Sequence, residues 1–236
     1  MQRTVMIALD FKNYEEVDDF LNQFPKDTHL TVKIGMELFY GIGPKIVKNI
    51  KDRGHDIFLD LKLNDIPNTV EKAMEQLGRM GVQYTTIHAM GGSKMIQAAK
   101  RGLKNGAKRM GLPEPKLLAV TELTSISDEQ LKNEQNVSLS MKDQVLHLAQ
   151  LTSDNGGDGV ICSPNEVSYL KGNLPDDFLF VTPGIRPAGF AKGDQNRTMT
   201  PSEAKVAGSS AIVVGRPITQ AENSVISYEN ILKDFA

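Results

Sequence analysis

The sequence predicts an α/β protein with the fold of a (β/α)8 barrel, built as a single domain over residues 1–236. Short apolar segments typical of buried strands alternate, eight times along the chain, with segments whose apolar residues recur at helical spacing. Strict alternation implies parallel strands joined by crossover helices, and eight such units in about 250 residues match the size of this barrel. An open, doubly wound sheet is the runner-up. Its dinucleotide-binding version is disfavoured because no G-x-G-x-x-G follows a strand segment.

In the first half of the chain, each apolar strand segment is followed by a helical one. The expected strands are Val5–Asp10, Thr31–Gly35, Ile57–Asn64 and Tyr84–Ala89. The expected helices are Tyr14–Phe24, Pro44–Arg53, Val70–Met80 and a segment from Gly92 to about Lys104. Apolar residues at helical spacing support the first helix. Pro44 at the start and Gly54 after the end are typical of helix boundaries and support the second.

The second half of the chain repeats this pattern. The expected strands are Lys116–Leu123, Gly159–Cys162, Phe178–Thr182 and Ala211–Gly215. The expected helices are Ser140–Asn155, Pro164–Leu170, Pro201–Ala207 and Ser224–Phe235. The long segment Arg186–Arg197 lies between the last two strands and contains Gly189 and Gly193 as candidate hinges. We interpret this segment as a lid.

Composition and charge exclude several classes of function. The chain has 27 Lys and Arg against 29 Asp and Glu, a formal net charge of −2, which argues against a general nucleic-acid binder. Cys162 is the single cysteine, so an intramolecular disulfide and a cysteine-rich metal site are excluded. No run approaches the roughly 18 apolar residues of a membrane span, and the N-terminal apolar run is too short for a signal peptide. We therefore expect a cytoplasmic protein with no membrane partner.

The segment Ile57–Val70 carries the first chemical signal. It begins with strict alternation, so one face of the strand is aliphatic and the other carries Asp60 and Lys62. Asp65 and Pro67 then break the pattern at the end of the strand. In isolation, Asp60 and Lys62 fit equally well an ordinary ion pair on the solvated face of an antiparallel strand.

The positions of other polar residues favour the hypothesis that Asp60 and Lys62 belong to a functional site. Asp10 and Lys33 also stand at or near the ends of predicted strands, and Thr124 follows the fifth. In a (β/α)8 barrel these ends meet on the face that holds the active site. Burying several charges together costs several kcal/mol per ion unless they pair. The sequence therefore predicts a charged active site at this end of the barrel.

The loops after the seventh and eighth strands predict a phosphate site. Barrels of this kind often bind phosphate there. The two loops supply backbone amides at Gly184 and Gly215 and guanidinium groups at Arg186 and Arg216, which suit bidentate phosphate contacts. Gln195, in the lid segment, could donate its amide as the lid closes. The alternative is a surface loop with incidental arginines.

These motifs together resemble the bacterial orotidine 5′-phosphate decarboxylase family. The resemblance rests on Asp60, Lys62 and Asp65 in a D-x-K-x-x-D pattern, its continuation IPNT, the TPGIRP and GRPI segments, and Asp10, Lys33 and Gln195. It runs from Asp10 to Arg216, nearly the whole chain. D-x-K-x-x-D alone is shared with 3-keto-gulonate 6-phosphate decarboxylase and hexulose phosphate synthase, whereas the continuation and the two loops make the narrower match specific.

The resemblance implies loss of CO2 from orotidine 5′-monophosphate without any cofactor or metal, giving uridine 5′-monophosphate, in a homodimer. It implies that Lys62 protonates C6 of the pyrimidine and that Asp60 lies beside the leaving CO2. Asp65 and Thr69 would reach across the dimer interface into the partner's active site.

The remaining residues are assigned to substrate binding by the same resemblance. Asp10 and Lys33 would hold the ribose hydroxyls, with Lys33 also part of the charged array, and Thr124 would face the base. Phosphate would be held by Gln195, Arg216 and the amide of Gly215, with Arg186 at the lid.

Three alternatives remain open at this point. One is a metal-dependent phosphosugar decarboxylase or aldolase of the same barrel group. Another uses Lys62 as a Schiff-base nucleophile. The third is a non-catalytic nucleotide-binding protein, which would keep the phosphate ligands but could lose Asp60 or Lys62.

Overall fold

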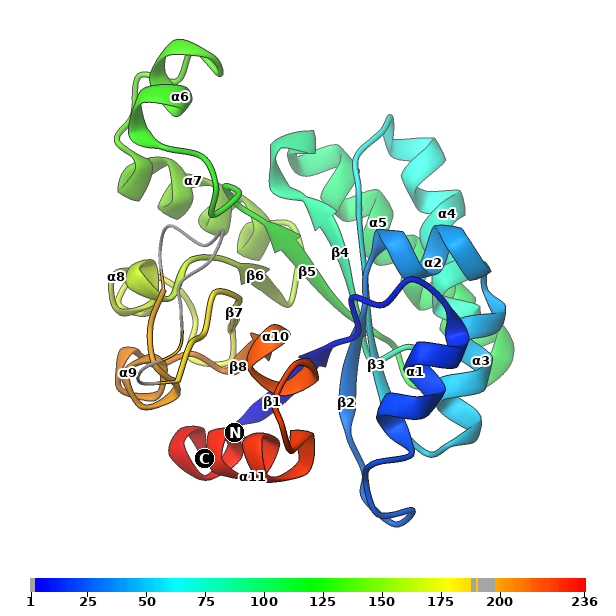
Figure 1. The fold of residues 1–236 in the computed structure, drawn as a ribbon. Coiled ribbons are helices and arrows are strands. Elements are labelled where there is room, and N and C mark those ends of the chain that lie inside the picture. Colours follow the sequence, from blue (N-terminus) through cyan, green and yellow to red (C-terminus); the bar gives the residue numbers. More distant parts are fainter. Residues whose placement is uncertain (1–2, 188–189, 191–197) are drawn as a thin grey trace.

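The strands form the closed, parallel (β/α)8 barrel that the sequence predicts. The computed structural model describes residues 3–187, 190 and 198–236. Each strand pairs in parallel with its neighbour in chain order, and β1 closes the barrel against β8 (Figure 1). The strands are β1 (Thr4–Ala8), β2 (Thr31–Ile34), β3 (Asp56–Leu63), β4 (Tyr84–His88), β5 (Lys116–Val120), β6 (Gly159–Ile161), β7 (Leu179–Thr182) and β8 (Ala211–Val214).

Helices follow the strands and surround the barrel (Figure 1). The helices are α1 (Tyr14–Leu21), α2 (Met36–Ile42), α3 (Lys45–Asp52), α4 (Pro67–Arg79), α5 (Gly92–Met110), α6 (Asp128–Asn133), α7 (Met141–Asp154), α8 (Val167–Lys171), α9 (Pro201–Ala207), α10 (Arg216–Thr219) and α11 (Ser224–Phe235), with 3-10 turns η1 (Ala89–Gly91) and η2 (Pro164–Glu166). Within the described residues, none of these helices is long and apolar enough to cross a membrane.

Three short helices differ from the sequence prediction, as does the length of α5. The helices α2, α6 and α10 were not predicted, and α5 continues to Met110 rather than ending near Lys104. The seven residues of α2 are fewer than the window over which helical spacing can be recognised, and only Leu38 among them is buried. The six-residue α6 projects from the barrel (Figure 1) and is held by a capping box between Ser127 and Gln130 rather than by an extensive apolar face.

Two apolar layers show which way the residues of β3 point. Ile57, Leu59 and Leu61 pack in the layer between the barrel and its helices, whereas Phe58 packs in the barrel interior. The other members of the interior cluster are Met6, Ala8, Leu118, Leu179, Val181, Ala211 and Val213. Because side chains alternate along a strand, Asp60 and Lys62 continue the inward face of Phe58 toward the mouth of the barrel. This is the division of faces that the alternation in the sequence predicts.

Candidate active site

A cavity of about 160 Å³ opens at the carboxyl end of the barrel strands. Lys33, Asp60, Lys62, Glu122 and Thr124 supply its polar wall. Its apolar wall is formed by Phe58, Val120, Leu123, Ile161, Cys162, Pro183 and Val213. A small apolar cavity with a few convergent polar groups at this end of a (β/α)8 barrel is a default candidate for an active site.

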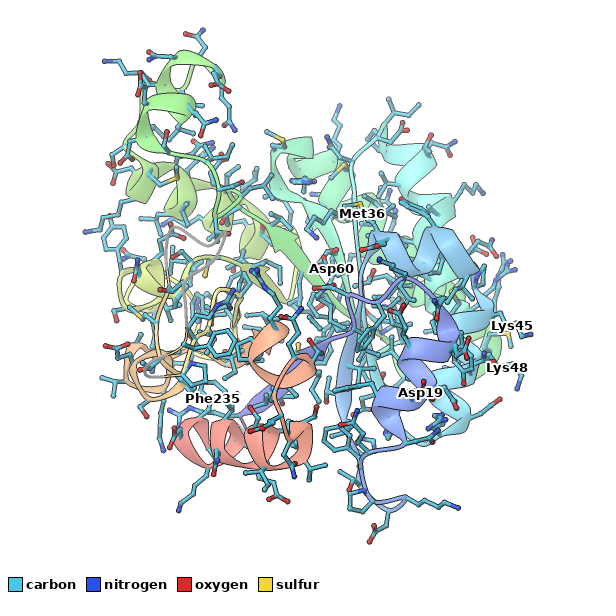
Figure 2. All side chains as sticks on the ribbon, viewed as in Figure 1. Asp19, Met36, Lys45, Lys48, Asp60 and Phe235 are labelled. Atoms are coloured by element: carbon cyan, nitrogen blue, oxygen red, sulfur yellow. The ribbon has the colours of Figure 1, made fainter. Side chains whose placement is uncertain are left out.

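Four charged side chains form a chain of alternating sign at this cavity. Lys33 Nζ lies 3.1 Å from Asp10 Oδ1 and 3.9 Å from Asp60 Oδ2. Lys62 Nζ lies 2.8 Å from the same Asp60 oxygen. Asp60 therefore lies between two ammonium groups. Figure 2 shows Asp60 among the strands, whereas Lys45 and Lys48 lie on the outside of the molecule.

Burial makes the pairing of Lys33, Asp60 and Lys62 necessary, whereas the side chain of Asp10 is 62% exposed. The side chains of Asp60 and Lys33 are 11% and 12% exposed, and that of Lys62 is 24% exposed. A buried carboxylate or ammonium group loses several kcal/mol of solvation unless an opposite charge and hydrogen bonds replace the water. The alternating arrangement supplies those partners, and the protein thereby holds two cations and a carboxylate in fixed positions at the cavity.

The backbone at Lys62 departs from a regular strand. Its φ is +51°, in the left-handed region that residues other than glycine rarely adopt. The pairing of β3 with β4 also shifts register between Leu59 and Leu63. Such irregularities re-aim side chains next to active sites.

Asp65 and Thr69 lie outside this cluster in the single chain. Both are exposed, Asp65 just after β3 and Thr69 in the first turn of α4. Asp65 Oδ1 accepts the backbone N–H of Ile66 at 2.6 Å. It makes no ion pair within 4.0 Å with another described residue. A role for these two residues across a dimer interface stays a prediction.

The residues predicted to bind phosphate lie on the loops after β7 and β8. Arg186 is buried, and its Nη1 donates to the carbonyl oxygen of Ile185 at 2.9 Å. Gly215 packs against Asp10, since a Cβ at Gly215 would lie 3.8 Å from Asp10 Oδ2. Arg216 is exposed at the first position of α10. Gln195 lies outside the described residues, as do the candidate hinges of the lid, Gly189 and Gly193.

Sequence reasoning missed Glu122, a buried carboxylate on the cavity wall. Glu122 is 4% exposed, and it accepts hydrogen bonds from Gln135 Nε2 at 3.4 Å and Gln144 Nε2 at 3.3 Å. The sequence prediction placed it inside a strand that ends at Leu123, whereas β5 ends at Val120. A glutamate within an apolar strand segment, followed by Thr124, was the signal that could have identified it.

His88 ends β4 close to these charges. Burial, and then the positive charge of Lys62, lower the pKa of its imidazole from the ordinary value. A neutral His88 therefore adds no further positive charge beside Lys62 near pH 7. Among the described residues, no group of three or more His, Cys, Asp or Glu is arranged to hold a metal ion.

Comparisons with known proteins cover the whole barrel. Residues 3–231 match the model of the orotidine 5′-phosphate decarboxylase / HUMPS family. The chain is 56% identical over 235 residues to the orotidine 5′-phosphate decarboxylase of Lactobacillus gasseri, covering 100% of both chains. It is 51% identical over 226 residues to that of Streptococcus mutans, covering 96% of this chain and 95% of the relative.

A solved structure gives the same result. The crystal structure of orotidine 5′-phosphate decarboxylase from Lactobacillus acidophilus matches with a TM-score of 0.89 and 52% identity, covering 99% of each chain. Fold, family model and full-length identity therefore agree, and the chain belongs to the orotidine 5′-phosphate decarboxylase / HUMPS family.

Proposed function

We propose that this protein decarboxylates orotidine 5′-monophosphate to uridine 5′-monophosphate and CO2 without a cofactor, as a step of pyrimidine biosynthesis. The observation that carries the proposal is the ammonium group of Lys62, 2.8 Å from the buried carboxylate of Asp60 at the mouth of the barrel. The full-length identity to proteins named orotidine 5′-phosphate decarboxylase supports the choice of substrate.

In the proposed reaction, the bond between C6 of the pyrimidine and its carboxyl carbon breaks. CO2 leaves, and the electron pair stays on C6. With no cofactor as an electron sink, fixed charges must stabilise this pair. Lys62, held in place by Asp60, supplies a cation there without reorganisation during the step, and its Nζ then donates a proton to C6.

Asp60 contributes to the same step by repelling the carboxylate of the bound substrate. Its carboxylate would lie beside the substrate carboxylate, and two like charges about 4 Å apart repel by roughly 4 kcal/mol at an effective dielectric constant near 20. The repulsion disappears as CO2 leaves. Binding of the remote phosphate can hold the substrate against it, because binding energy far from the reacting centre offsets destabilisation there.

The substrate-binding roles are part of the same proposal. Asp10 and Lys33, which contact each other at 3.1 Å at the rim of the array, hold the ribose hydroxyls. Lys33 also belongs to the charged array with Asp60, which Asp65 of the partner subunit would complete. Thr124, on the cavity wall, faces the base. Phosphate binds to Gln195, Arg216 and the amide of Gly215, with Arg186 at the lid.

We also propose a homodimer in which Asp65 and Thr69 complete the partner's site. Exposed apolar side chains on the segments that follow β2, β3 and β4 support this proposal. Ile66 is 66% exposed, Tyr40 69%, Met90 54% and Met36 43%. Because β2, β3 and β4 are neighbours in the barrel, these segments lie on the same side of its carboxyl end, and large exposed apolar side chains there are typical of an interface. A single domain and a cytoplasmic location stay predictions.

The proposed reaction is tested by ultraviolet-monitored turnover of orotidine 5′-monophosphate in excess EDTA. We expect wild type to convert orotidine 5′-monophosphate. The turnover rate of Lys62→Ala should be lower by about a thousandfold or more, since a charge-stabilising group and a proton donor are removed together. Lys45→Ala, which removes an exposed lysine of α3 (Figure 2), is the control and should match wild type.

The second candidate is the metal-dependent phosphosugar decarboxylase or aldolase that the shared D-x-K-x-x-D pattern leaves open. Turnover by wild type in EDTA argues against it. If wild type is inactive on orotidine 5′-monophosphate, but acts on phosphosugars once Mg²⁺ is supplied, the proposed reaction is wrong and this second one replaces it.

A further inference from the structure

One residue of β4 faces the irregular part of β3. In the ladder between these strands, Leu59 pairs with Thr85 and Leu63 pairs with Ile87. Asp60, Leu61 and Lys62 therefore stand opposite Thr86 alone. A regular ladder would place one residue there, so the two strands cannot continue their backbone hydrogen bonds across this stretch.

The hydroxyl of Thr86 replaces a missing backbone partner. Lys62 donates its backbone N–H to Thr86 Oγ1 at 2.9 Å. A left-handed conformation at a lysine is unfavourable and persists only where the surroundings hold it. The bond to Thr86 acts directly on the residue whose φ is +51°.

The same hydroxyl also orients Asp60. Thr86 Oγ1 donates to Asp60 Oδ1 at 2.9 Å. A hydroxyl has one proton to donate and lone pairs to accept with, so these two bonds are compatible. With Oδ1 bound to Thr86, Oδ2 is the oxygen that faces Lys62 Nζ at 2.8 Å and Lys33 Nζ at 3.9 Å. Thr86 is 0% exposed, so its hydroxyl is shielded from bulk solvent.

We propose that Thr86 is a positioning residue for the reaction. Through one hydroxyl it sets the orientation of the Asp60 carboxylate and the backbone conformation of Lys62, and so it fixes the relative position of the two charged groups. Its effect on turnover rests on the proposed function. Its effect on the backbone of Lys62 does not.

The test is Thr86→Val, which keeps the shape of the side chain and removes both hydrogen bonds. We expect kcat to fall about 10- to 100-fold, because small displacements of reacting groups have effects of this size. KM should stay within about twofold of wild type, since the contacts proposed to hold ribose and phosphate are unchanged. Thr86→Ser restores the hydroxyl and should restore most of kcat.

The neighbouring Thr85 provides a matched control. It is also 0% exposed in β4, and its Oγ1 has no hydrogen-bond partner among the described residues. Thr85→Val therefore makes the same chemical change at the same depth without removing a hydrogen bond. It should leave kcat and KM at wild-type values. If replacing any buried threonine lowered kcat, the decrease would appear in both Thr85→Val and Thr86→Val.

A second readout does not depend on activity. Amide hydrogen exchange at Lys62, measured by NMR, should be about tenfold or more faster in Thr86→Val than in wild type. Thr86→Ser and Thr85→Val should retain the slow exchange. If Thr86→Val shows wild-type kcat and a protected Lys62 amide, the proposal is overturned. If wild type does not decarboxylate orotidine 5′-monophosphate, the proposed function fails, and the exchange at Lys62 alone decides whether Thr86 holds this backbone.

Discussion

The ammonium group of Lys33 lies between two carboxylates, and Gly35 makes room for it. A Cβ at Gly35 would lie 3.1 Å from Lys33 Nζ and 3.5 Å from Asp10 Oδ1. The backbone of Gly35, with φ −88° and ψ −179°, suits any residue. The absence of a side chain, rather than an unusual conformation, is therefore what this position contributes to the charged array.

We predict that Gly35→Ala lowers kcat/KM several-fold to about tenfold, with little change in stability. The added methyl group displaces the flexible end of Lys33 by a few tenths of an ångström, and catalytic geometry is sensitive on this scale. Steady-state kinetics and urea unfolding measure the two effects.

The control for this prediction is Gly172→Ala. Gly172 follows α8 with φ −74°, and among the described residues a Cβ there would meet only Tyr169 O, at 3.8 Å. A drop in kcat/KM of the same size in both variants would show that Gly35 has no special relation to Lys33.

At the scale of elements, α4 and α5 pack almost backbone to backbone. A Cβ at Gly102 would lie 2.3 Å from Glu71 O, and one at Gly106 would lie 2.1 Å from Glu75 O. Gly78, on α4, approaches Leu103 O in the same way, at 2.4 Å. Because α4 begins at Pro67, two residues after Asp65, this contact also helps to determine where the start of α4 lies relative to the barrel mouth.

We predict that Gly102→Ala destabilises the protein by about 1–3 kcal/mol. Alanine in a helix is ordinarily about 1 kcal/mol better than glycine, but overpacking against a backbone carbonyl costs more than this gain. Urea unfolding measures the difference.

For Gly41→Ala we expect the opposite effect on stability, and this variant serves as the control. Gly41 lies inside α2, and in the described part of the chain a Cβ there would meet only Lys12 O, at 3.9 Å. Its substitution should therefore raise stability by up to about 1 kcal/mol. Equal stabilisation by Gly102→Ala would contradict the close packing of α4 and α5.

Across the whole molecule, the features that repeat along the chain could be predicted from the sequence. Alternation of strands and helices predicts the barrel, and the two-residue period of β3 places Asp60 and Lys62 on its inward face. The parallel barrel then brings Asp10 and Lys33 to the same end, because all strands point the same way. Each of these steps depends on local pattern or on a general rule of topology.

The details that depend on contacts between distant segments could not be predicted in this way. The left-handed backbone of Lys62 and the two bonds of Thr86 arise from the register between β3 and β4. The burial of Glu122 depends on where the segment after α6 places Gln135 and where α7 places Gln144. No period in the sequence encodes which side chain meets which across neighbouring strands and loops.

The proposed dimer can be tested through its shared active sites. If Asp65 acts in the partner's site, each site combines Lys62 of one chain with Asp65 of the other. Lys62→Ala and Asp65→Ala are then each inactive alone. A mixed dimer, with one Lys62→Ala chain and one Asp65→Ala chain, can be purified through two different tags. One of its two sites combines the intact Lys62 with the intact Asp65, so the dimer should recover about half of wild-type activity.

A second mixed dimer supplies the control for this experiment. Asp60 and Lys62 contact each other at 2.8 Å within one chain. A mixed dimer of Asp60→Ala and Lys62→Ala therefore carries a defect in both sites and should stay inactive. If the dimer of Lys62→Ala and Asp65→Ala is equally inactive, Asp65 serves its own chain. Its exposed position beside Ile66 would then need a movement of the segment between β3 and α4, rather than a partner, to bring it to Lys62.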